Sequence, residues 1–178
     1  MGIGFASDIN VRHPHKEYKD EYATLTLNHG RNPKNATYAY VTVPSVTKDE
    51  FDKIVKGNNI EIISNTPDIC AVTYKGQDIK VLGVNFWEPS SINTENGTIS
   101  STAAASVTVK KSGNNIKISI SDPTQLATNN ISIQLPYSAA NIVNCNSKLN
   151  ITSLNPIKIE FNPTKSLGQS QIVEFTIE

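Results

Sequence analysis

Histidine side chains are the groups in this sequence that could bind a metal ion or transfer protons near neutral pH. His13 and His15 flank Pro14, and this spacing places both imidazoles on one side of an extended segment, as in a metal pair. No further histidine or cysteine follows nearby, so we expect a solvated loop and no metal site. His29 precedes Gly30, a combination typical of a strand end followed by a turn. We expect its imidazole to bond to backbone and to have no catalytic role.

Paired carboxylates could instead hydrolyse a glycosidic bond, which requires two acidic groups facing each other across a cleft. The adjacent pairs are Asp20 with Glu21, on a polar segment, and Asp49 with Glu50. The second pair is explained by the start of a helix, where negative charge is favourable. We therefore expect no glycosidase-type site. The sequence also has no GxSxG pattern, which argues against a small independent enzyme.

The two cysteines, Cys70 and Cys145, belong to no CxxC or Cys/His cluster, which argues against structural zinc. Cys70 lies in the apolar sequence ICAV, so we expect it to be a small core residue of a buried strand. A disulfide between the two stays open, because a secreted protein would permit one.

The pattern around Thr47 predicts a short helix. Thr47 and Glu50 match the S/T-x-x-E capping box, in which each side chain bonds to the backbone N–H of the other residue. An apolar stripe follows at helical spacing and consists of Phe51, Ile54 and Val55. Gly57 can adopt the left-handed conformation that ends a helix. We expect this helix to cover a face or an edge of a sheet.

Strand patterns dominate the rest of the chain. Apolar and polar residues alternate with the period of two of a half-buried strand in residues 22–28, 116–120, 131–135, 157–161 and 173–177. Residues 37–43 and 81–87 are rich in β-branched, aromatic or aliphatic side chains. Turn formers lie between these segments. Short strands that recur this often predict an all-β fold, with antiparallel β-sandwich(es) and one short helix.

A domain boundary is expected near residue 90. The segment EPSSINTENG is polar, contains Pro89 and Gly97, and has no periodicity. After it the composition changes to strands rich in Ser, Thr, Asn and Ile. We therefore expect one unit over residues 1–90 and a small β-sandwich domain over residues 91–178.

Charge and hydropathy restrict the classes of partner. Lys and Arg total 16, as do Asp and Glu, so the chain lacks the positive excess expected of a surface that binds nucleic acid or an anionic polysaccharide by electrostatics. No apolar run reaches the ~18 residues of a transmembrane helix, so we expect no membrane span. The N-terminus MGIGFASDIN lacks the basic and apolar regions of a signal peptide, and Met1 is expected to start a fragment of a longer protein.

Aromatic side chains could bind sugars, since carbohydrate sites commonly combine exposed aromatic faces with amide and carboxylate groups. Trp87 follows Phe86 at the end of an apolar run, so we expect it to pack in the core. Tyr18, Tyr22 and Tyr137 have less apolar neighbours and are candidates for exposure. Aromatic residues are 7% of the chain, which does not favour a dedicated sugar-binding module.

An ordered series of short motifs runs through the chain. It consists of His29-Gly30, Asn32-Pro33, Asn35-Ala36, Tyr38-Ala39-Tyr40, Val43-Pro44, Ile60-Glu61-Ile62, Asn65-Thr66, Asp68-Ile69, Ala71-Val72, Asn85-Phe86-Trp87 and Ser121 to Gln125. In order and spacing the series resembles the C-terminal β-sheet region of polysaccharide lyase family eight, which includes hyaluronate, chondroitin and xanthan lyases. The resemblance implies that residues 1–90 are the C-terminal part of a central β-sandwich domain and residues 91–178 a small C-terminal β-sandwich domain.

The resemblance also implies a chemistry. Family members cleave uronic-acid polysaccharides by β-elimination, with a Tyr and a His as base and acid and an Asn that helps neutralise the uronate carboxyl. These residues lie on an upstream helical domain, and none of them maps onto this chain. His29 and Tyr38 belong to the sheet motif. We therefore expect no catalytic, cofactor-binding or metal-binding residue here.

The favoured interpretation is a non-catalytic C-terminal β-domain fragment of a secreted, extracellular polysaccharide lyase that acts on hyaluronan, chondroitin or xanthan. We expect the fragment alone to be inactive, although its parent is an enzyme, and to need no cofactor. Its expected partners are the upstream helical catalytic domain and polysaccharide. The alternative is a free-standing carbohydrate-binding or adhesin-type β-sandwich module, and this alternative stays open.

Overall fold

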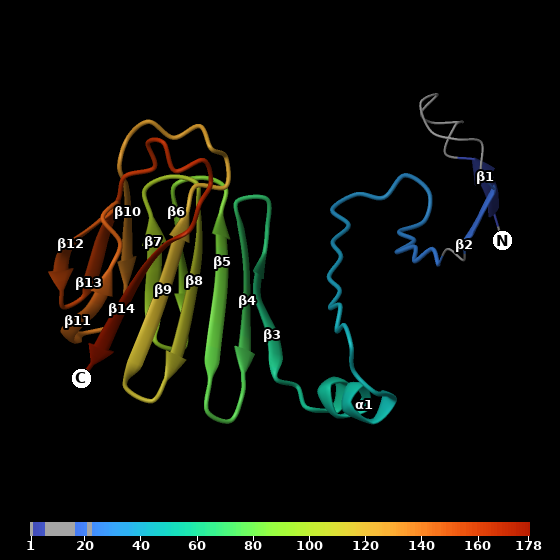
Figure 1. The fold of residues 1–178 in the computed structure, drawn as a ribbon, viewed down its shortest axis with the longest axis horizontal. Coiled ribbons are helices and arrows are strands. Elements are labelled where there is room, and N and C mark those ends of the chain that lie inside the picture. The colour runs from blue at the N-terminus through green and yellow to red at the C-terminus, as the bar shows by residue number, and fades with distance from the viewer. Residues whose placement is uncertain (1, 6–16, 21–22) are drawn as a thin grey trace. The chain divides into compact units, whose positions relative to one another are not determined.

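The computed structural model describes residues 2–5, 17–20 and 23–178, and the chain divides into two units between Thr42 and Val43 (Figure 1). In the first unit β1 (Gly2–Phe5) pairs antiparallel with β2 (Glu17–Asp20). The described residues of the second unit contain α1 and strands β3 to β14. No helix in the described part of the chain is long and apolar enough to cross a membrane.

The strands expected at residues 22–28 and 37–43 are wrong for this structure. Residues 23–43 adopt neither helix nor strand, and no described segment pairs with them. Their apolar side chains are exposed, with Leu25 82% and Tyr40 67% accessible. A strand needs a neighbour that satisfies its backbone N–H and C=O groups, and alternation of side chains cannot supply one.

Helix α1 (Lys48–Lys56) begins with the capping box that the sequence predicts. The backbone N–H of Thr47 donates to Oε2 of Glu50 at 2.8 Å, and the N–H of Glu50 donates to Oγ1 of Thr47 at 3.3 Å. Hydrogen bonds from the backbone and side chain of Thr47 lower the pKa of Glu50. The pair Asp49 and Glu50 is thus explained by the helix start.

The end of α1 corrects two expectations. Gly57 has a right-handed conformation with φ −74°, and the next residue, Asn58, takes the left-handed one with φ 47°. Asparagine tolerates positive φ better than most residues, which explains the exchange of roles. No residue of α1 is buried, so the helix covers no sheet among the described residues.

The larger sheet of the second unit is antiparallel. Its strands, in spatial order, are β11 (Ala139–Cys145), β14 (Gln171–Ile177), β9 (Asn115–Ser121), β8 (Ala105–Ser112), β5 (Lys80–Phe86), β4 (Ile69–Lys75) and β3 (Ile60–Asn65). The smaller sheet has the order β12 (Leu149–Leu154), β13 (Ile157–Phe161), β10 (Ile131–Leu135), β7 (Gly97–Ser101) and β6 (Ser90–Thr94). Among the described residues, the paired strands of both sheets are all antiparallel, as the sequence predicts.

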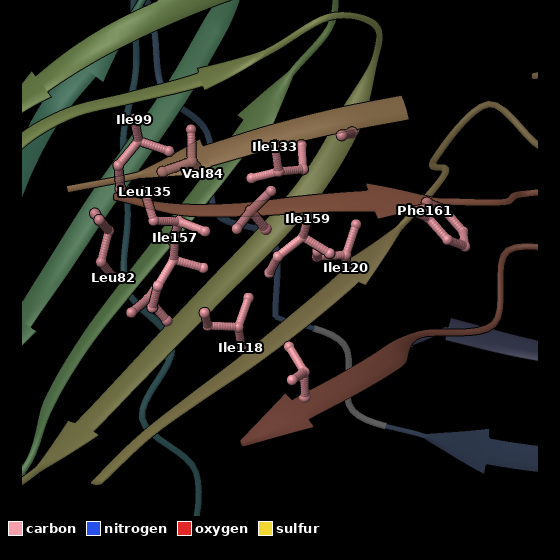
Figure 2. Close-up of a cluster of buried hydrophobic side chains, with 14 of the residues drawn as sticks. Leu82, Val84, Ile99, Ile118, Ile120, Ile133, Leu135, Ile157, Ile159 and Phe161 are labelled. Carbon is pink, nitrogen blue, oxygen red and sulfur yellow. The ribbon is translucent and has the colours of Figure 1, made fainter. Parts of the chain in front are cut away.

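The core lies between the two sheets, where alternate side chains from both inner faces meet (Figure 2). Ile118 of β9, Ile133 of β10 and Phe175 of β14 are at most 1% exposed. Full burial of such a side chain contributes about 1.5–3 kcal/mol. Strands predicted at residues 116–120, 131–135, 157–161 and 173–177 are confirmed, with their apolar faces inward.

The boundary expected near residue 90 falls inside this sandwich. The polar segment around it forms the β6–β7 hairpin of the smaller sheet, while β3, β4 and β5 complete the larger sheet beside β8. The division seen in the structure lies instead between Thr42 and Val43. A polar hairpin on an edge resembles a linker in composition, because one of its faces is solvated.

Candidate functional site

A pocket of about 400 Å³ opens at one end of the sandwich, between the ends of β4, β5 and β8 and the turn that joins β6 to β7. Its lining includes the inner-face residues Thr73, Leu82 and Val109. These three lie opposite one another on neighbouring strands and are buried. The floor of the pocket is therefore continuous with the sandwich core, in which Leu82 appears in Figure 2.

Three lysines line the same pocket, nearer to the strand ends than the floor residues. Lys75, Lys80 and Lys111 are in direct cross-strand register on β4, β5 and β8. Each is two residues from a floor residue on its own strand, so the pleat turns all three toward the same face. We call these three residues the lysine row. Like charges opposite one another destabilise a sheet, so the row requires anions nearby.

Two carboxylates supply part of that negative charge. Nζ of Lys75 lies 3.0 Å from Oε2 of Glu61 and 3.2 Å from Oε2 of Glu95. Nζ of Lys80 lies 3.2 Å from Oε1 of Glu95. Lys111 forms no ion pair with any carboxylate in the described part of the chain. The row is thus neutralised at two of its three positions.

The ion pairs also stabilise the charged forms of Lys75 and Glu95. Hydrogen bonds to Glu61 and then to Glu95 raise the pKa of Lys75. Hydrogen bonds from Lys75 and then Lys80 lower the pKa of Glu95. Near neutral pH the ammonium keeps its protons and the carboxylate stays ionised and paired. Both groups are suited to binding and poorly suited to proton transfer.

Tyr137, which follows β10, lines the pocket with its aromatic ring and its hydroxyl group. It is half-buried and packs against the core, and its hydroxyl is hydrogen-bonded to the side chain of Asn96. Burial raises the pKa of Tyr137, and the charge of Glu95 raises it further, against the effect of Asn96. The phenol is therefore neutral. The sequence suggested exposure for this residue, and the structure places it at the pocket instead.

The side chains that the sequence singles out do not converge on this pocket. His13, His15 and Tyr22 lie outside the described residues, as do the side chains of Tyr18 and Asp20. The ring centroid of His29 is 6.5 Å from that of Tyr38, which stacks on Tyr40 at 6.5 Å and 13°. These exposed rings belong to the first unit. Among the described residues no group of three or more His, Cys, Asp or Glu could hold a metal ion.

Trp87 corrects an expectation. The sequence predicted that it packs in the core, but its side chain is 45% exposed. Phe86, the last residue of β5, is fully buried, and the pleat turns the next residue to the other side. An indole face is therefore available at the surface of the second unit.

The cysteines are both free. Cys70 on β4 is only half-buried, which corrects the expectation of a core residue, and Cys145 on β11 is exposed. Five strand spacings of ~4.8 Å separate β4 from β11 in the larger sheet, so the two strands are about 24 Å apart across the sheet. A disulfide requires Cα atoms within about 7 Å, so the two cysteines cannot pair in this fold.

The SDPTQ motif has a structural role. Asp122 is 1% exposed, and its Oδ1 accepts hydrogen bonds from N and Oγ1 of Thr124 at 2.9 and 2.6 Å. Its Oδ2 accepts from the backbone N–H of Ala127 at 3.0 Å. Burial acts to raise the pKa of Asp122, but the hydrogen bonds from Thr124, Ala127 and Gln125 prevail and lower it. The carboxylate thus holds together the loop between β9 and β10.

Sequence reasoning missed the lysine row and the Glu95 turn. The three lysines come from separate strands, so their adjacency depends on register, which a single sequence does not give. The polar alternation around Thr73 and Lys75 was the available signal, because polar residues in an otherwise inward-facing series indicate the open end of a sandwich.

Two family descriptions match the chain. Residues 61–130 match the polysaccharide lyase family 8, C-terminal beta-sandwich domain. Residues 3–55 match the polysaccharide lyase family 8, super-sandwich domain. The two matches follow each other in the order that the sequence motifs imply, and residues 131–178 lie outside both.

Relatives show the same pattern. The chain is 33% identical to the hyaluronate lyase HylB of Enterococcus faecalis over 128 residues, which are 72% of this chain and 12% of that protein. It is 30% identical to the xanthan lyase of Bacillus sp. (strain GL1) over 158 residues, 88% of this chain and 16% of that protein. The chain thus spans less than a fifth of the length of these relatives.

Solved structures agree on the fold. A chondroitin AC lyase of Streptomyces coelicolor matches 99% of this chain and 23% of its own with a TM-score of 0.80 at 20% identity. A Paenibacillus xanthan lyase matches 76% of this chain and 13% of its own with a TM-score of 0.67 at 27% identity. Motifs, family matches, relatives and fold lead to one assignment: the chain belongs to polysaccharide lyase family 8.

Proposed function

We propose that this chain is the non-catalytic C-terminal β-domain region of a secreted lyase that cleaves uronic-acid polysaccharides by β-elimination. Its relatives are named for hyaluronan, xanthan and chondroitin, which makes these polymers the candidate substrates. β-Elimination needs a base for the proton next to the uronate carboxyl and a donor that neutralises that carboxyl. The observation that carries the proposal is that residues 61–130 match the C-terminal beta-sandwich domain of the family and residues 3–55 its super-sandwich domain.

The outer face of β3 and β4 supports a role as part of a larger assembly. Ile60 lies opposite Tyr74 and Ile62 opposite Val72, and these four apolar side chains are between 37% and 51% exposed. A cluster of paired apolar side chains on a surface marks an interaction site. In our proposal this face packs against the rest of the enzyme, whose helical domain carries the catalytic residues.

Secretion is part of the same proposal. A polysaccharide of high mass does not cross a cell membrane, so an enzyme that cleaves it must meet it outside the cell. We expect the protein in the medium of the producing cells, and its retention inside intact cells would contradict this part of the proposal.

Ultraviolet absorbance of unsaturated uronate products tests the assignment. The purified 178-residue chain should release none from hyaluronan, chondroitin or xanthan, while the complete protein should release them from at least one of the three. Turnover by the 178-residue chain alone would show that it carries its own catalytic residues. Absence of turnover by the complete protein on all three polymers would contradict the lyase assignment.

A further inference from the structure

We propose that the pocket beside the lysine row binds one acidic sugar unit of a polysaccharide, with the sugar carboxylate against Lys111. The site lies wholly within the sandwich, at the β6–β7 turn. The inference rests on the proposed function for the class of polymer. It would give this region a task of its own, that of binding the polysaccharide.

Lys111 is the lysine of the row that has no carboxylate partner among the described residues. Its neighbour across the strands is Lys80, and the row continues to Lys75, so three lysines occupy adjacent positions on three strands. Glu61 and Glu95 neutralise the other two lysines, while Lys111 has no described carboxylate within 4 Å. It is also half-buried, which makes an unpaired charge more costly than on an open surface. A ligand carboxylate would give Lys111 the negatively charged partner that Lys75 and Lys80 already have.

The other lining groups suit a sugar ring. Leu82 and the ring of Tyr137 offer apolar surface for the C–H face of a pyranose. The amides of Gln77, Asn93 and Asn96 provide donors and acceptors for hydroxyl groups. Amide groups that can both donate and accept match the several hydroxyls of a sugar better than they match a phosphate, most of whose oxygens only accept hydrogen bonds.

Size and charge limit the ligand further. A volume of about 400 Å³ is at the lower end of the roughly 300–1,000 Å³ of ligand pockets, which favours one or two sugar rings over a longer stretch. Asp78 also lines the pocket, and with Glu61 and Glu95 it balances the lysine row in number. A ligand group that brings more than one negative charge into the pocket would be repelled by these carboxylates, whereas a sugar unit with a single carboxylate can approach Lys111.

Titration of the 178-residue chain with hexasaccharides of hyaluronan, chondroitin and xanthan, followed by calorimetry, tests the proposal. At least one should bind, and the same hexasaccharide with its carboxyl groups reduced to alcohols should bind about tenfold more weakly, as expected for the loss of one charged hydrogen bond. Inorganic phosphate at equal concentration should not compete. Competition by phosphate as strong as that by the hexasaccharide would show a simple anion site and overturn the proposal.

A pair of variants locates the site. Lys111→Gln should weaken binding about tenfold, whereas Lys110→Gln should change it less than about twofold. Lys110 is the matched control, because it is the preceding residue of β8 and lines a different hollow on the opposite face. Thermal unfolding of both variants checks that the fold is intact.

Two results would overturn the proposal. The first is failure of all three acidic hexasaccharides to bind the unsubstituted chain, and the second is equal weakening by the two substitutions. Neither result bears on the absorbance assay for lyase activity, which measures the complete protein. Failure of this site and failure of the proposed function are therefore separable.

Discussion

Oε2 of Glu95 lies 3.2 Å from Nζ of Lys75, and this contact joins the β6–β7 turn of the smaller sheet to the end of β4 in the larger one. Elsewhere the two sheets are held together by apolar side chains. At this end ion pairs of Glu95 with Lys75 and Lys80 link the two sheets, so charged groups line the pocket. The contact is therefore both a structural link and one wall of the candidate sugar site.

Replacement of Glu95 by glutamine should lower the melting temperature by less than about 4 °C at low salt, because exposed ion pairs contribute little to stability. The lysine row would then keep only Glu61 as a close anion, so the effect should shrink as salt screens the repulsion. Thermal unfolding at about 0.01 M and 1 M NaCl measures this, given the screening lengths at these two concentrations.

Glu88→Gln is the matched control, since Glu88 is exposed and forms no ion pair among the described residues. It should leave the melting temperature unchanged at both salt concentrations. An equal fall for both variants would show that net charge, rather than the contact with Lys75, determines the effect.

Asp122→Asn should destabilise the sandwich by about 1–3 kcal/mol, because an amide cannot accept all the hydrogen bonds that the buried carboxylate accepts. Its NH₂ group would face a donor of Thr124 or Ala127 in a site that is 1% exposed. Urea unfolding gives the free energy directly. Asp78→Asn, in the exposed β4–β5 turn, should cost less than about 0.5 kcal/mol.

The pH dependence of unfolding should carry the signature of Asp122. Its folded pKa is lowered, so its contribution to stability is fully present above the pKa of the unfolded chain, near 4. The contribution is lost as pH falls through the lower, folded value. Stability measured from pH 7 downward should therefore decline below about pH 4, and less so in Asp122→Asn. Identical pH profiles for the two proteins would contradict the assigned role of the carboxylate.

The sequence correctly predicted those elements that depend on residues close together in the chain. The alternation of Ile116, Ile118 and Ile120 determines which face of β9 is buried, whichever strand lies beside it. The capping box of α1 likewise involves residues three apart. The candidate pocket could not be predicted in this way, because Lys75 and Lys111 become neighbours of Lys80 only through the register of three strands.

The failures have the same origin. Residues 23–28 alternate as a strand should, but a strand also requires a partner, and none is described for them. Trp87 stands next to buried Phe86 in an apolar run, and only the place where β5 ends decides that its indole is exposed. Composition around residue 90 suggested a linker because the β6–β7 hairpin is as polar as one.

The exposed face of β3 and β4 gives a prediction about assembly. Ile62→Lys should change the free energy of unfolding of the 178-residue chain by less than about 0.5 kcal/mol, because the side chain is 51% exposed on an edge strand. In the complete protein the same change should lower the melting temperature, since it places a charge in the proposed interface. Differential scanning calorimetry of both proteins provides the comparison. Equal effects in the two would argue against an interface at this face.

The backbone conformation of Gly97 positions the β6–β7 turn at the pocket. It has φ +120° at the start of β7, and a Cβ added there would lie 2.7 Å from Cβ of Pro136. Gly97→Ala should therefore cost about 1–3 kcal/mol in stability, from a strained φ and from this close contact. The strain would be relieved by movement of the β6–β7 turn, which carries Glu95 and Asn96, so sugar binding should weaken as well. Gly168→Ala is the control, because Gly168 also has positive φ, +76°, but lies in the loop between β13 and β14 and does not line the pocket. It should cost about 1–2 kcal/mol, as for a residue in the left-handed region, and should leave binding unchanged. Loss of binding in both variants, in proportion to their stability, would show that general loosening rather than the position of the turn controls the pocket.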